Sequence, residues 1–381
     1  MKRPAVLGLV LGCISLAYGQ HNWGFRTLPG FLVPHHEDMQ AMMAHTTAFE
    51  LTREWRLDSS GILFKRHRNP FVGLGLNYMD LGNSINGKAF TFFACYDLGL
   101  LGTQKWSLRG RLGVGTGYLT KMYSQANPMN RAIGSHFNGF MQVLGYMQYQ
   151  PSKRLAFQLG LGLSHHSNGN FSQPNLGVNE PSLFVGCKLS DYARKISNPD
   201  LGTTRVHTVQ WQLGFRLGLR QISVDDEMNF TIAIADLMIQ YPQNPVRRWR
   251  LGICYYYDRT YQYTKFQPMP GARLDRASEI AISGGQEYRI GRVGFTGDLG
   301  VYVYRPDRTK RAYYEALGLR YYVNDHLVVM NRLKAHLTSA DFFEWGICYS
   351  INGRRGVNPG FGKGLRWLGS PFRRKPPHLN F

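Results

Sequence analysis

The chain has 381 residues, of which 43% are hydrophobic and only 18% are charged, so it is not an intrinsically disordered protein. Glycine accounts for 43 residues and aromatic side chains for 13%, a combination typical of all-β proteins with many turns. The formal net charge is +21, which points to an anionic partner such as lipid phosphates or nucleic acid.

The first 19 residues resemble a secretory signal peptide. Lys2 and Arg3 precede an apolar run, and the small residues Ala17 and Gly19 precede a predicted cleavage site at Gln20. Export disfavours nucleic acid as the partner. Beyond this segment no apolar run is long enough for a transmembrane helix. Residues 20–44 are predicted to be a periplasmic leader.

Neither a metal nor a cofactor is predicted. The leader holds a histidine and acid cluster, but this cluster lacks a recognised ligand spacing. Four cysteines follow the signal peptide and are too widely separated for a metal motif. They are expected to be small apolar side chains on strands. The cluster consists of His35, His36, Glu37, Asp38 and His45, and the cysteines are Cys95, Cys187, Cys254 and Cys348.

Apolar and polar residues alternate repeatedly between residues 45 and 350. The clearest case runs from Val209 to Arg220, where every second residue is a large apolar one and the others are Gln, Gly or Arg. Repetition of this pattern without apolar helices is typical of a membrane β-barrel, with its apolar face toward lipid. The sequence therefore predicts an all-β, antiparallel outer-membrane β-barrel of about 12–16 strands. We expect one large barrel rather than two in tandem, followed by a basic tail at 351–381.

A short turn at Pro151–Lys153 orients the next strand. Short turns lie on the periplasmic side of such barrels, so the strand from about 154 to 167 runs outward and residues 168–180 are extracellular. Alternation places His165 and Ser167 on the lipid face and His166 toward the lumen. Polar residues are costly on a lipid face, which makes the pair a candidate for function. In the alternative interpretation they are two residues of the membrane interface.

A His-x-Ser pair suits nucleophilic catalysis, because an imidazole two residues from a hydroxyl can act as its base. The segment His165–Gly169, followed by Pro174–Asn179, resembles the PagL-type lipid A deacylase family of Gram-negative outer membranes. The stretch from about 105 to 190 carries most of the resemblance. Ala132–His136 and Leu176–Asn179 also resemble longer chains of this kind from Bacteroidetes.

The resemblance implies roles for individual residues. Ser167 is implied to be the nucleophile and His165 the general base, with Asn168 and Asn175 near the oxyanion. The family's acid falls at Asn179, and alternation turns the neighbouring Glu180 toward the lumen. The third member of the catalytic triad, beside Ser167 and His165, is therefore either Asn179, which would give a weaker site, or Glu180, turned outward by a bulge.

The resulting prediction is an outer-membrane esterase that removes an acyl chain from lipid A. Its partner is lipid A or lipopolysaccharide, it is embedded in the membrane, and no nucleic acid is involved. The alternatives are a non-enzymatic barrel, such as a porin or a structural protein, and a polysaccharide-binding surface protein. The chain departs from the family pattern in two ways: Asn179 stands where the family has an acid, and about 190 residues follow the motif. The alternation in these residues predicts further strands.

Overall fold

The structure is a computed structural model, and it describes residues 21–57, 68–190, 209–224, 229–244, 246–262, 277–290, 292–308, 311–337 and 339–351. The predicted signal peptide and basic tail lie outside the described residues. No helix in the described part of the chain is long and apolar enough to cross a membrane. Two short 3₁₀ helices occur there, η1 (Glu37–Met42) and η2 (Arg259–Gln262).

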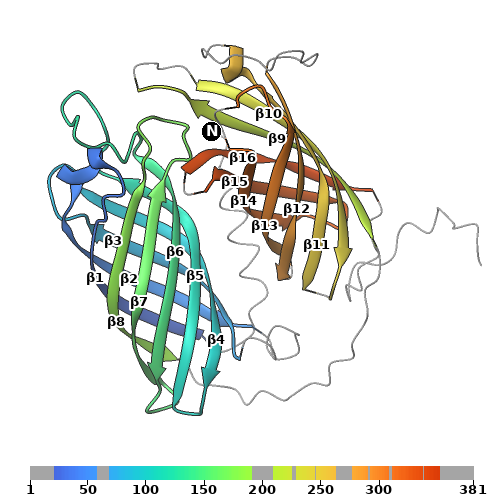
Figure 1. The fold of residues 1–381 in the computed structure, drawn as a ribbon. Helices are drawn as coiled ribbons and strands as arrows, with labels where there is room; N and C mark the ends of the chain where they lie inside the picture. Colours follow the sequence, from blue (N-terminus) through green and yellow to red (C-terminus); the bar gives the residue numbers. More distant parts are fainter. Residues whose placement is uncertain are drawn as a thin grey trace, which may run out of the picture.

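The described residues form sixteen antiparallel strands, which Figure 1 shows as two separate groups. The first eight are β1 (His21–Phe31), β2 (His45–Arg56), β3 (Phe71–Asp80), β4 (Lys88–Gly102), β5 (Trp106–Leu119), β6 (Phe137–Tyr149), β7 (Leu155–Ser167) and β8 (Val178–Ser190). The others are β9 (Gln210–Gln221), β10 (Asn229–Pro242), β11 (Arg247–Asp258), β12 (Ser278–Ile290), β13 (Val293–Tyr304), β14 (Tyr313–Tyr322), β15 (Leu327–His336) and β16 (Ser339–Ser350).

Each group of strands closes into a barrel of its own. In the N-terminal barrel β8 pairs back onto β1, and in the C-terminal barrel β16 pairs back onto β9. The predicted all-β, antiparallel barrel fold is thus confirmed, but the expectation of one large barrel is wrong. Alternation within a strand reports which face is buried, whereas closure depends on which distant strand pairs with the edge.

The predicted periplasmic leader at 20–44 is also wrong. Its first half is β1, which pairs with β2 along its whole length and with β8 on the other side. Without β1 the N-terminal barrel would have an open edge, whose unpaired backbone groups are not tolerated in lipid. The second half contains η1, whose side chains Met39 and Met42 are fully buried.

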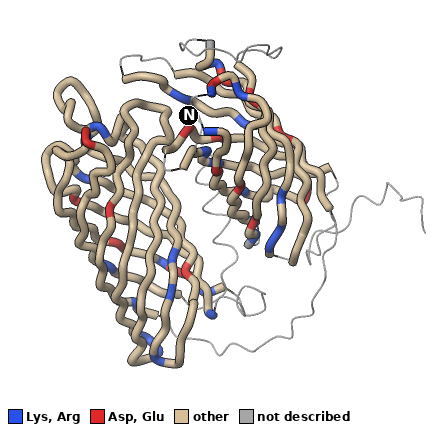
Figure 2. The backbone as a smooth tube through the Cα atoms, in the orientation of Figure 1, with Lys and Arg blue, Asp and Glu red and all other residues tan. Residues whose placement is uncertain are grey.

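The barrel interiors are polar and densely filled. In the N-terminal barrel Arg26 bonds to Glu50 at 2.8 Å and to Glu54 at 3.1 Å, and Lys188 lies 3.0 Å from Asp97. Figure 2 shows basic and acidic residues together along the strands of both barrels. Several basic residues are therefore paired with acids inside the barrels rather than facing lipid phosphates.

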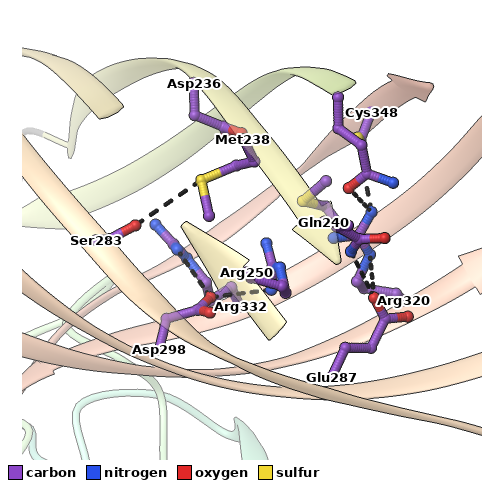
Figure 3. A network of polar contacts seen from close by, with 12 residues as sticks. Asp236, Met238, Gln240, Arg250, Ser283, Glu287, Asp298, Arg320, Arg332 and Cys348 are labelled. Carbon is purple, nitrogen blue, oxygen red and sulfur yellow. Dashed lines mark hydrogen bonds and ion pairs between the residues drawn. The ribbon is translucent and has the colours of Figure 1, made fainter. Parts of the chain in front are cut away.

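The C-terminal barrel holds a comparable network. Figure 3 shows Arg250 and Arg332 converging on Asp298, at 3.0 and 3.5 Å, beside the Glu287 and Arg320 cluster. Eight strands enclose an interior that side chains fill, whereas porins with an open aqueous channel have 16–18 strands. The filled interiors give no support to the porin alternative. The four cysteines at 95, 187, 254 and 348 are free, and three of them are buried.

Candidate active site

The candidate site lies where β7 ends and β8 begins. In the register of these strands His165 is opposite Asn179, and Ser164 is opposite Glu180. Directly opposed residues of an antiparallel pair share a face and bring their side chains close together. The pairing therefore brings Asn179, and not Glu180, to the face that carries His165.

The three polar side chains on this face form a continuous chain of hydrogen bonds. Nε2 of His165 is 3.0 Å from Oγ of Ser167, and Nδ1 of His165 is 2.7 Å from Oδ1 of Asn179. Below them on the same face Leu163 is 48% exposed and Leu161 is 64% exposed, as lipid-facing side chains are. The alternation of β7 places His165 and Ser167 on this outward face, where Ser167 itself is only 4% exposed.

A fourth residue, His35, extends this chain, and sequence reasoning considered it only as a metal ligand. Nε2 of His35 is 2.9 Å from the carbonyl oxygen of Leu176, and its Nδ1 is 3.3 Å from Nδ2 of Asn179. Among the described residues no three His, Cys, Asp or Glu side chains converge as metal ligands would.

The proton positions along this chain follow from the Leu176 carbonyl. A carbonyl only accepts, so Nε2 of neutral His35 donates to it and Nδ1 of His35 accepts. The Asn179 amide must then present its NH₂ group to His35 and its oxygen to His165. That oxygen accepts from Nδ1–H of His165, which leaves Nε2 of His165 as an acceptor for the hydroxyl of Ser167.

Glu180 points the other way, into the barrel. Its carboxylate accepts a hydrogen bond of 2.6 Å from the hydroxyl of Thr46, and its side chain is 1% exposed. No bulge interrupts the pairing of β7 with β8 at this point. The interpretation in which Glu180 turns outward as the third member is therefore wrong. His166 also faces the lumen, where Nε2 lies 3.0 Å from Oγ1 of Thr91 on β4.

Glu180→Gln is expected to change the rate of deacylation by less than about threefold, because the barrel wall separates this carboxylate from His165. The measurement is fatty-acid release from lipid A by the purified variant and by the parent protein. A loss of order 10²–10⁴ would instead assign the role of the third member to Glu180.

Asn168 and Asn175 organise the loop between β7 and β8. Nδ2 of Asn168 donates to Oγ of Ser135 at 3.1 Å and to the carbonyl of Ser172 at 2.8 Å. The backbone N–H of Asn168 donates to Oδ1 of Asn175 at 2.8 Å. The amide of Asn168 thus links this loop to the connection between β5 and β6, and Nδ2 of Asn175 donates to Oδ1 of Asn170 at 3.2 Å, so neither NH₂ group is directed at Ser167. The next residue, Gly169, has φ of 61°, which glycine adopts without strain.

Two family models match the chain, one for each barrel. The model described as lipid A 3-O-deacylase (PagL) matches residues 52–188, and the model described as acyloxyacyl hydrolase, C-terminal domain, matches residues 209–353. Together they cover more than half of the chain. The chain belongs to the PagL family of lipid A deacylases. This deacylase is an outer-membrane ester hydrolase that acts on lipid A, so the predicted function, enzyme class and location are confirmed.

The deacylase also matches solved structures of outer-membrane barrels. The crystal structure of the outer membrane enzyme PagL is 16% identical, covers 43% of this chain and 97% of its own, and has a TM-score of 0.32. Neisserial surface protein A is 12% identical over 45% and 97%, with a TM-score of 0.30. A mutant Rhodopseudomonas blastica porin is 8% identical over 87% and 99%, with a TM-score of 0.17. These values are too low to bear on activity. No curated protein matches the sequence.

Proposed function

We propose that this deacylase hydrolyses the ester at the 3-O position of lipid A by a serine mechanism in which Ser167, His165 and Asn179 act together. The observation that carries the proposal is the chain of hydrogen bonds from Ser167 through His165 to Asn179, at 3.0 and 2.7 Å. The family model that covers these residues is the one described as lipid A 3-O-deacylase.

The reaction proceeds in two halves. Oγ of Ser167 attacks the ester carbonyl carbon while its proton passes to Nε2 of His165. The tetrahedral intermediate collapses, and the departing sugar oxygen takes the proton from His165, which leaves an acyl-serine. Water then attacks the acyl-serine, gives a proton to His165, and releases the free fatty acid as the proton returns to Ser167.

Asn179 supports His165 as a hydrogen-bond acceptor rather than as a charge. Its oxygen holds the imidazole in the tautomer that leaves Nε2 free to accept the proton of Ser167. An amide does not stabilise the imidazolium as a carboxylate does. His35 is a positioning residue in this proposal, because it holds the amide of Asn179 with its oxygen toward His165.

The oxyanion of the intermediate would be stabilised by a backbone N–H group that follows Ser167 in the chain. The N–H of Asn168 already donates to Asn175, and none of the hydrogen bonds found in the described residues uses the N–H of Gly169. We assign the N–H of Gly169 as the donor, with Asn168 and Asn175 fixing the loop that presents it.

The place of the site in the membrane fits the substrate. Ser167 ends a strand that runs outward from the short turn after β6, so the site lies on the lipid-facing side near the extracellular rim. The outer leaflet at this depth holds the ester-linked chains of lipopolysaccharide. Lipid A is thus reached from the bilayer without passing through either barrel.

The decisive experiment is mass spectrometry of lipid A after incubation with the purified protein. The expected result is loss of one ester-linked acyl chain and appearance of a free hydroxyl at the 3-O position. Loss of a chain from another position would contradict the assigned ester, and an unchanged lipid A would contradict the proposed activity.

A further inference from the structure

The C-terminal barrel contacts the loop that follows Ser167 in the candidate active site. Nδ2 of Asn170 donates to the carbonyl of Ala340 and, at 3.2 Å, to that of Asp341, where β16 begins. Gln221, at the end of β9, donates its N–H to the carbonyl of Asn170 at 2.8 Å and accepts from the N–H of Gln173 at 2.8 Å. The loop that follows Ser167 is therefore held by the C-terminal barrel, as the closeness of β16 to the upper end of β7 in Figure 1 illustrates.

One apolar side chain of the C-terminal barrel reaches the face that carries the nucleophile. Gly139 on β6 is the residue directly opposite Ser167, so a side chain at 139 would lie beside that of Ser167. The place of this missing side chain is taken by Phe343 of β16: a methyl group added to Gly139 would lie 2.9 Å from Cζ of Phe343. The same ring also packs against Gly169.

Phe343 belongs to the outward face of its own barrel. Further along β16 on this face, Trp345 is 60% exposed and Ile347 is 52% exposed. On β6 and β7, Val143 is 51% exposed and Leu163 is 48% exposed. Below the contact at the rim these apolar side chains do not cover one another, which leaves their surface to the acyl chains of lipids.

Taking the proposed function as its basis, we infer that the C-terminal barrel completes the substrate site and that Phe343 is the surface against which the acyl chain of lipid A lies when its ester reaches Ser167. The occupant is an acyl chain, because the surface beside and below Ser167 is apolar on both barrels. Phe343 acts in binding, since it carries no group that takes part in the chemistry.

The test compares Phe343→Ala with Phe295→Ala in the full-length protein. Phe295 is also a half-buried phenylalanine on the outward face, but it lies on β13, which β14 and β15 separate from β16. KM and kcat are measured for fatty-acid release from lipid A in mixed micelles. Phe343→Ala is expected to raise KM roughly tenfold with kcat within about threefold, as loss of apolar contact with a substrate does.

Phe343→Leu restores most of the apolar surface and is expected to recover most of the affinity, while Phe295→Ala matches the parent protein. The inference is overturned if Phe343→Ala behaves like Phe295→Ala, or if it lowers kcat while KM stays unchanged. Either of these outcomes leaves the proposed function intact. Failure of the parent protein to release any fatty acid would instead reject the proposed function itself.

Discussion

Ser167→Ala is expected to reduce fatty-acid release from lipid A by more than about 10³-fold, because the variant lacks the oxygen that forms the acyl-enzyme. The barrel should remain folded. The substitution removes one hydrogen bond to His165, worth about 1 kcal/mol, and leaves both closed sheets unchanged. The measurement is fatty-acid release by the purified variant, together with circular dichroism to verify the β structure.

The matched control is Ser164→Ala on the same strand. Ser164 faces the lumen, where its hydroxyl accepts a hydrogen bond from Gln142 at 3.3 Å. Ser164→Ala removes a hydroxyl group from β7, as Ser167→Ala does, but it leaves the outward face unchanged. The rate of fatty-acid release should therefore stay near that of the parent protein. Equal activity of Ser167→Ala and Ser164→Ala would show that Ser167 is not the nucleophile.

His35→Ala is expected to lower the rate about 10- to 100-fold in the parent background but less than about threefold when Asn179 is replaced by Asp. Without His35 the Asn179 amide is free to turn over and present its NH₂ group to His165. His165 would then carry its proton on Nε2, and this wrong tautomer cannot accept the proton of Ser167. A carboxylate has no such orientation to lose, because both of its oxygens accept hydrogen bonds.

The four proteins of this double-mutant cycle are the parent, His35→Ala, Asn179→Asp and the double variant. Asn179→Asp alone should raise the rate at least about tenfold, since a carboxylate stabilises the imidazolium formed during attack. His36→Ala is a suitable control, because His36 is the neighbour of His35 in the same loop. If His35→Ala costs the same in both backgrounds, His35 does not act through the Asn179 amide.

The sequence by itself determined the class of fold and the family. Alternation along strands such as Val209–Arg220 depends only on which side chains meet lipid, so it can be read residue by residue. The same alternation placed His165 and Ser167 outward and Glu180 inward, because the period of a strand is two. The His-x-Ser pair and its resemblance to the deacylase family were local in the sequence as well.

Pairing between distant residues was decided only by the tertiary structure. Whether sixteen strands make one barrel or two depends on the strand with which β8 pairs, and that partner, β1, lies in a segment whose charge and proline hide its alternation. The choice of Asn179 over Glu180 required the register between β7 and β8. Along the sequence His35 lies 130 positions from His165, and Phe343 lies 174 positions from Gly169. Closure of the N-terminal barrel brings His35 to the site, and docking of the C-terminal barrel brings Phe343 there.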